Sequence, residues 1–104
     1  MNDRPKPLGP VEAYEFIQEL LATRDSIAYT SHVRDRMRQR HFTVDDIRRV
    51  LLFGTVAPNP EWKDTHQQWV YTIAGVDYDN EPLAIVVALE PALNRLTVIT
   101  GHDV

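Results

Sequence analysis

Three side chains spaced four residues apart, His32, Arg36 and Arg40, are the part of this sequence best suited to chemistry. A helix turns by about 100° per residue, so Arg36 falls about 40° and Arg40 about 80° from His32. The apolar Val33 and Met37 fall about 100° and 140° from His32. The spacing therefore predicts that the three polar residues form one ridge on a short helix, beside the apolar stripe that faces the core.

A ridge of this kind could cleave RNA without a metal ion. A neutral imidazole can accept a proton as a general base, and guanidinium groups can hold a phosphate and stabilise its developing charge. RNA brings its own nucleophile, the 2′-hydroxyl. The predicted helix offers no general acid for this reaction, and the candidate proton donors are His102 and Tyr71. Arg34 and Arg38, on the other flank of the helix, are candidate substrate-binding residues.

The same arginines also have a structural interpretation. Arginines beside an apolar stripe usually lay their methylene groups over the edge of the core and pair with carboxylates. A histidine at the start of a helix is often a surface or capping residue. Under this interpretation the chain is a structural domain, and we would expect Arg36 and Arg40 to be bonded to Asp or Glu within the core.

No metal or cofactor site is expected. The histidines lack metal-ligand spacing such as His-x-x-x-His; they are His32, His41, His66 and His102. The chain has no cysteine, which excludes disulfides and thiolate zinc sites. A helix-turn-helix that reads DNA is disfavoured, because Asp45 and Asp46 would lead the second helix toward phosphate.

Two tryptophans, Trp62 and Trp69, flank Lys63 and His66. Stacking on nucleic-acid bases is one interpretation of such a cluster. Anchoring of a loop or of the core is the commoner role of tryptophan, and it is the role that we expect here.

Charge is distributed unevenly along the chain. The 104 residues carry a net charge of −4, which on its own counts against nucleic-acid binding. Residues 32–49 hold six arginines and three aspartates, a local charge of +3, which leaves −7 for the rest of the chain. A basic segment on an acidic body can still attract a phosphate backbone.

Length and composition predict one domain with one core. We expect residues 1–9 to form a flexible tail and residues 10–104 a single α+β domain. The first residues lack an apolar leader, and the longest apolar stretch, Leu83 to Leu89, is too short to span a bilayer. Together with the absence of cysteine, this predicts a cytoplasmic protein that does not associate with membranes.

Helical periodicity dominates the first half of the chain. Thr30 or Ser31 can cap a helix, Asp46 lies in a capping-box-like position, and Ile27–Tyr29 is predicted to be a short apolar link. Three helices are predicted: Pro10 to about Thr23, His32 to about Arg40, and a third that Thr43 caps and Gly54 ends.

The second half of the chain changes to a period of two. This pattern predicts strands over residues 69–74, 83–89 and 96–100, with a shorter strand near residues 55–57. Tight turns between them imply an antiparallel meander. The predicted fold class is therefore α+β, with the N-terminal helices packed on one face of a small antiparallel sheet.

The segment from Tyr29 to Ile47, YTSHVRDRMRQRHFTVDDI, resembles the signature of a bacterial domain-of-unknown-function family. That signature is roughly Tyr-Thr-x-His-x-x-x-Arg-Met-x-x-Arg-x-Ile-Ser, followed by a helix that ends in Gly. Residues 75–83 are similar to its Gly-x-Asp-x-Asp hairpin, and residues 98–100 to its closing strand. The chain departs from the pattern at Asn80-Glu81, where a Gly-basic turn is usual, and at Gly101-His102, where an apolar or aromatic residue is commoner.

The family itself resembles the barnase/RelE-like group of small ribonuclease toxins, which are paired with antitoxins. The resemblance implies a RelE/barnase-like fold, RNA as substrate, an antitoxin partner, and a site made by His32, Arg36 and Arg40. The first hypothesis is therefore a toxin-like, metal-independent endoribonuclease. The alternative is a non-catalytic module that binds a protein or a nucleic acid with the same basic helix face.

Overall fold

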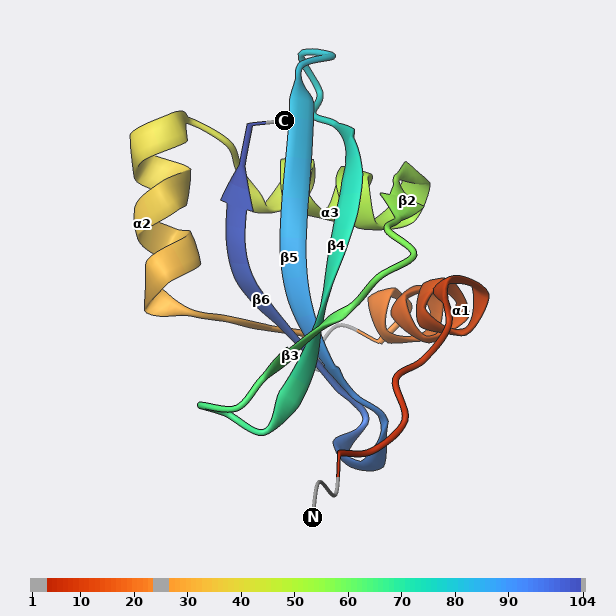
Figure 1. Ribbon diagram of the computed structural model, residues 1–104. Helices are drawn as coiled ribbons and strands as arrows, with labels where there is room; N and C mark the ends of the chain where they lie inside the picture. The colour runs from red at the N-terminus through yellow and green to blue at the C-terminus, as the bar shows by residue number, and fades with distance from the viewer. Residues whose placement is uncertain (1–3, 24–26, 104) are drawn as a thin grey trace.

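Helices occupy the first half of the chain and strands the second, with one short strand between the first two helices (Figure 1). The computed structural model describes residues 4–23 and 27–103. The elements are, in order, α1 (Pro10–Leu21), β1 (Ile27–Tyr29), α2 (Ser31–Arg40), α3 (Val44–Phe53), β2 (Thr55–Val56), β3 (Glu61–Lys63), β4 (Gln68–Val76), β5 (Pro82–Glu90), the 3-10 turn η2 (Pro91–Leu93) and β6 (Arg95–His102). No helix in this part of the chain is long and apolar enough to cross a membrane.

The strands form one mixed, six-stranded sheet in the order β1-β6-β5-β4-β2, and β3 also pairs with β4. The meander of β4, β5 and β6 is antiparallel, as the period of two predicts. β1 instead runs parallel to β6. The predictions of an apolar link at Ile27–Tyr29 and of a purely antiparallel sheet are therefore wrong. Three residues are too short for a periodic pattern, and a partner strand so distant in sequence leaves no local signal.

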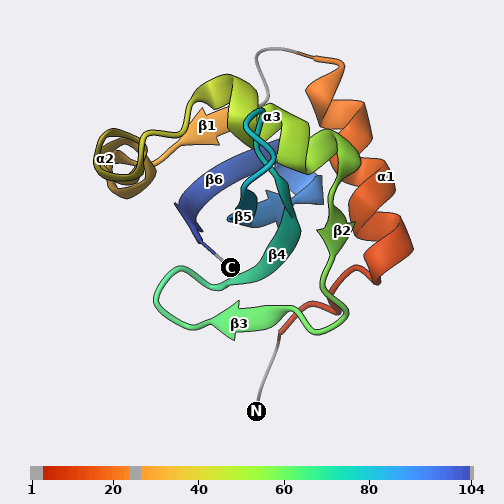
Figure 2. The same cartoon turned by 90° about the horizontal axis from the view of Figure 1, so that it is seen from above.

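Two helices cover one face of the sheet, which confirms the predicted α+β fold class. α3 lies behind the central strands and α1 lies beside it (Figures 1 and 2). Their apolar stripes meet alternate residues of β4, β5 and β6, since successive side chains of a strand point to opposite faces. The largest fully buried side chains of this core are Ile17, Leu20, Ile47, Leu51, Ile73, Ile85 and Leu96. Among the described residues, no helix covers the opposite face of the sheet, which we call the open face.

α2 lies at the β6 edge of the sheet rather than over its face (Figure 2). β1 pairs only with the first part of β6, up to Val98, so the second part of β6 has no strand neighbour on that side. α2 packs along this free edge, with Val33 fully buried and Met37 half-buried against the core.

The start of α2 is tied to an irregularity in β6. Val98 pairs with Val87 and Thr100 with Val86, which leaves Ile99 as an extra residue in a bulge. The Thr30 hydroxyl donates to the Ile99 carbonyl oxygen (2.7 Å) and accepts from the Val33 N–H (3.1 Å). Thr30 is therefore the N-cap of α2, one of the two residues predicted for that role.

The predicted capping box of α3 is confirmed, and its Asp46 carboxylate also bonds to the β4–β5 turn. The Thr43 hydroxyl accepts from the Asp46 N–H, and the Asp46 carboxylate accepts from the Thr43 N–H (2.9 Å). The same carboxylate accepts from the Tyr78 N–H in the β4–β5 turn (3.0 Å). Burial favours a higher pKa for Asp46, but the hydrogen bonds from Tyr78 and Thr43 prevail and lower the pKa.

Residues 4–9 of the predicted tail lie against the β3–β4 hairpin and the core. The Leu8 N–H donates to the Tyr71 hydroxyl (2.8 Å), and the Trp69 indole donates to the Pro5 carbonyl (2.7 Å). The Arg4 guanidinium lies 5.7 Å from the Trp62 ring centre. Residues 1–3 are outside the described residues, and the flexibility of the segment stays a prediction.

Gly101 lets the end of β6 approach the core closely. A Cβ atom at this position would lie 2.7 Å from Cζ of Phe42, the residue that leads from α2 to α3, and 3.0 Å from Cδ1 of Ile85. Phe42 is buried, so its ring has little room to move.

We expect Gly101→Ala to lower the free energy of unfolding by about 1–3 kcal/mol, because the new methyl group overpacks the Phe42 ring. The measurement is urea denaturation. Thr100→Ala is the control: it alters the preceding residue, which faces the open side, and should cost less than about 1 kcal/mol. Equal losses in the two variants would show that the Phe42 contact is not the constraint.

We expect Asp46→Asn to lower the free energy of unfolding by about 2 kcal/mol at pH 7, because charge-assisted hydrogen bonds are lost. The Asp46 carboxyl group has a lower pKa in the folded state than in the unfolded state. Its ionised form therefore stabilises the protein at pH values above the unfolded-state pKa, and this stabilisation is lost as the pH falls through the folded-state pKa. The difference in the free energy of unfolding between wild type and variant should therefore shrink below about pH 4. Asp45→Asn, at an exposed neighbour, should show no such difference. A difference for Asp46→Asn that is independent of pH would contradict this account.

Candidate functional site

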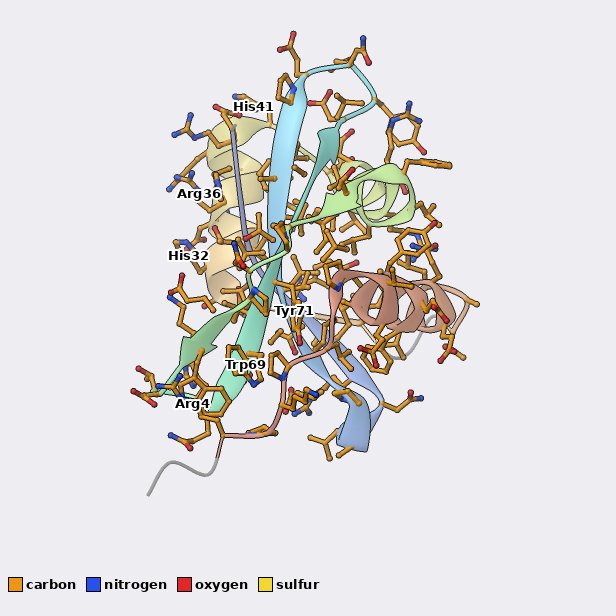
Figure 3. The ribbon with its side chains drawn as sticks, turned by 45° about the vertical axis from the view of Figure 1, so that its right-hand side comes forward. Arg4, His32, Arg36, His41, Trp69 and Tyr71 are labelled. Atoms are coloured by element: carbon orange, nitrogen blue, oxygen red, sulfur yellow. The ribbon has the colours of Figure 1, made fainter. Side chains whose placement is uncertain are left out.

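The ridge of His32, Arg36 and Arg40 borders the open face of the sheet. Arg36 is half-buried, and its Nε donates to the Gly101 carbonyl oxygen (3.3 Å) on the free edge of β6. Arg40 pairs with Asp103 just beyond β6 (Nη1 to Oδ2, 3.0 Å). Figure 3 shows His32 and Arg36 on the same side of α2, away from Tyr71. The structure thus keeps together the three residues that the sequence grouped.

His32 lies in the first turn of α2 and is exposed. Its imidazole makes no hydrogen bond or ion pair with any residue of 4–23 or 27–103. It follows the Thr30 cap by two residues, so the anchor of Thr30 on β6 also fixes the position of His32.

Arg34 and Arg38 lie on the other flank of α2. Burial raises the pKa of Tyr29, and the positive charges of Arg48 on α3 and of Arg34 oppose that rise. Arg34 is therefore close to Tyr29, at the end of β1. Arg38 pairs with Asp35 on the exposed surface of the helix, where 73% of its side chain is accessible. The structure does not bring these two candidate substrate-binding residues to the ridge.

The contacts of the ridge differ from those that a purely structural role predicts. Arg36 is bonded to a backbone carbonyl, and Arg40 forms an exposed ion pair in which 48% of its side chain is accessible. Neither arginine is paired with a carboxylate in the core. An exposed pair like that of Arg40 and Asp103 contributes only about 0–1 kcal/mol, so a phosphate can displace Asp103 at little cost.

The two candidate acids lie on opposite faces of the sheet. Tyr71 is buried on the helix-covered face, and its hydroxyl accepts the Leu8 N–H. Burial raises its pKa, against the opposing effect of that hydrogen bond. His102 ends β6 between Gly101 and Asp103, the residues that Arg36 and Arg40 contact. Because Gly101 faces the core, strand alternation places His102 on the open face with the ridge.

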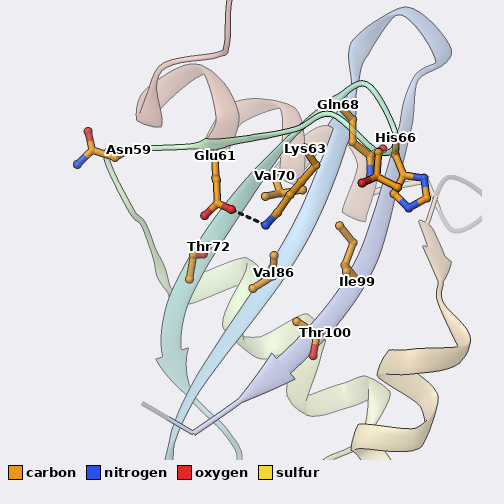
Figure 4. Close-up of a pocket in the computed structure, with 11 residues that line it drawn as sticks. Asn59, Glu61, Lys63, His66, Gln68, Val70, Thr72, Val86, Ile99 and Thr100 are labelled. Carbon is orange, nitrogen blue, oxygen red and sulfur yellow. Dashed lines mark hydrogen bonds and ion pairs between the residues drawn. The ribbon is translucent and has the colours of Figure 1, made fainter.

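The open face holds a groove that sequence reasoning missed (Figure 4). One pocket of about 470 Å³ has an apolar floor of Val70, Val86 and Ile99. Its walls are polar and include Asn59, Glu61, Lys63, Thr65, His66, Gln68, Thr72 and Thr100. A second pocket of about 410 Å³ shares His66, Gln68 and Ile99 and continues to Thr30, Glu90, Thr97 and Arg95. We call the two pockets together the open-face groove.

The missed residues come from the β3–β4 hairpin. β3 is three residues long, in a polar stretch without an apolar period, so nothing local marks it as a strand. The only signal was the pair Trp62 and Trp69, whose rings contact edge to face at 5.3 Å. Trp62 donates to Asp64 (2.6 Å) and Trp69 to Pro5, so both tryptophans anchor the hairpin rather than present free faces for stacking.

No group of three or more metal-ligating side chains occurs among residues 4–23 and 27–103. The charged side chains that line the groove include two ion pairs, Lys63 with Glu61 and Arg95 with Glu90.

Residues 29–100 match the model of a protein family described as "Domain of unknown function (DUF4258)". The chain belongs to this family. The matched residues include all of α2 and both strands that form the floor of the groove with β6. No curated protein and no solved structure matches the chain. The DUF4258 assignment thus defines the domain, and any function must be argued from the site.

We expect Arg36→Ala to lower the free energy of unfolding by about 1–2 kcal/mol, because it leaves the Gly101 carbonyl without its donor. Arg38→Ala, two residues away on the exposed flank of the same helix, should change it by less than about 0.5 kcal/mol. Thermal and urea denaturation of both variants measure the difference. Indistinguishable stabilities would mean that the bond to Gly101 does not hold α2 on the sheet.

Proposed function

We propose that this DUF4258 domain is a toxin-like endoribonuclease that cleaves RNA without a metal ion. The observation that carries the proposal is the ridge itself, which places one imidazole and two guanidinium groups along the β6 edge of the open face. The likeness of the signature to that of barnase/RelE-like toxins supports the same reaction class.

His32 acts as the general base in this proposal. It takes the proton from a ribose 2′-hydroxyl, whose oxygen then attacks the adjacent phosphorus. The P–O5′ bond breaks, leaving a 2′,3′-cyclic phosphate and a 5′-hydroxyl. The imidazole is suited to this role because it is exposed and engaged by no neighbour within residues 4–23 and 27–103.

Arg36 and Arg40 hold the phosphate. Arg36 donates to Gly101 through Nε, which orients the guanidinium plane and leaves its two terminal nitrogens for a bidentate contact. Arg40 exchanges its exposed pairing with Asp103 for the phosphate. Both charges act on the oxygens that become more negative in the transition state.

The open-face groove receives the RNA strand next to the cleaved bond. Its apolar floor suits the face of a base, and its amide and hydroxyl groups suit base edges and ribose. A protein partner of the antitoxin kind would keep the domain inactive in the cell, as a nuclease without such control would destroy its host's RNA.

The test is cleavage of a single-stranded RNA by the purified chain in the presence of EDTA. We expect wild type to produce 2′,3′-cyclic phosphate ends and to leave the matching DNA intact. His32→Asn should lower the rate by about 10²–10⁴-fold, the usual contribution of a general base. Arg40→Ala should also lower it, with little effect on stability.

His41→Asn is the matched control, because it makes the same change at the exposed residue that ends α2. His41 has a φ of 58°, a conformation that asparagine tolerates, so the fold should be kept. Loss of activity in both histidine variants would argue against a specific base. RNA binding without cleavage by wild type would instead favour a binding module on the same face.

A further inference from the structure

The proposed cleavage requires a proton donor for the departing 5′-oxygen, and the ridge of α2 has none. Tyr71 is buried on the opposite face of the sheet, with its hydroxyl bonded to Leu8. His102 ends β6 between the residues that Arg36 and Arg40 contact, and it lines neither pocket of the groove. The donor should instead lie where an RNA strand in the groove passes the start of α2, because His32 is there.

His66 occupies that place. It lies in the turn of the β3–β4 hairpin and lines both pockets of the open-face groove. The pocket of about 410 Å³ also includes Thr30, the N-cap of α2, so His66 borders the same space as the residue that precedes the first turn of α2. Figures 1 and 2 show the hairpin turn on the side of the molecule where α2 lies, and Figure 4 shows His66 at the rim of the groove.

His66 differs from the other titratable groups of the groove in its pairing and in its chemistry. Lys63 is paired with Glu61, and Arg95 with Glu90. His66 makes no side-chain hydrogen bond or ion pair with any residue of 4–23 or 27–103. Imidazole is also the side chain best able to hold and release a proton near neutral pH.

The hairpin that carries His66 is held in place at several points. The Trp62 and Trp69 rings pack edge to face, and the Trp62 indole donates to Asp64. The turn closes with a bond from the Gln67 N–H to the Asp64 carbonyl (3.3 Å), and Gln67 has a φ of 52°. The neighbours of His66 are therefore fixed, while its imidazole projects free.

We propose that His66 is the general acid of the ribonuclease reaction, which rests on the function proposed above. His32 removes the proton of the 2′-hydroxyl, and the 2′-oxygen forms a bond to phosphorus. As the P–O5′ bond breaks, protonated His66 gives its proton to the 5′-oxygen, which leaves as a hydroxyl group. One proton is taken up and one released, so the reaction balances without a metal ion or another reactant.

The test compares two substrates that differ only in the leaving group. The first is the dinucleotide UpA, whose 5′-oxygen must be protonated as it leaves. The second is uridine 3′-(p-nitrophenyl phosphate), whose p-nitrophenolate leaves without a proton. We expect His66→Asn to lower kcat on UpA by at least about 10²-fold and kcat on the aryl ester by less than about 10-fold. His32→Asn should lower kcat on both substrates.

His41→Asn, expected to keep both activities, is the control for a histidine outside the groove, and thermal denaturation checks that each variant is folded. Unchanged cleavage of UpA by His66→Asn, or equal losses on the two substrates, would overturn the assignment of His66 while leaving the proposed nuclease intact. A wild-type protein that cleaves neither substrate nor longer RNA would overturn both proposals.

Discussion

The free edge of β6 beyond Val98 is the constraint on which the rest of the site depends. β1 ends its pairing there, so the backbone of β6 must be satisfied by something other than a strand. α2 takes that role through Thr30 on the Ile99 carbonyl and Arg36 on the Gly101 carbonyl. The helix that carries the polar ridge is thus held at two points by the strand edge that it covers.

Structural and functional roles are combined in one residue at this edge. Arg36 donates its Nε to the sheet and presents its terminal nitrogens to solvent, so stability and phosphate binding use different atoms of the same guanidinium. The two interpretations of the sequence, arginines that support the core edge and arginines that bind a substrate, are therefore compatible for Arg36. The two interpretations differ for His32 and Arg40, because both residues are exposed and contribute little to packing.

Sequence reasoning succeeded where a feature is local and failed where it is not. The caps at Thr30 and Thr43 and the ridge on α2 follow from spacings of three and four residues, which one helical turn brings together. The parallel pairing of β1 with β6 joins residues about seventy positions apart, and nothing in Ile27–Tyr29 marks it. The groove depends on the pairing of β3 with β4, so the sequence gives no sign that His66 shares a pocket with Thr30.

The bulge at Ile99 also determines how β6 tolerates changes in length. The extra residue reverses the alternation of the strand, so that Gly101 faces Phe42 and His102 faces the groove side. Loss of the bulge with all residues kept would exchange those orientations and drive the His102 imidazole toward the Phe42 ring, whereas deletion of Ile99 would restore regular pairing and keep them. Insertions in β6, and deletions other than that of the bulged residue, should therefore be disfavoured among members that keep this architecture, because they would turn the wrong side chains toward the core.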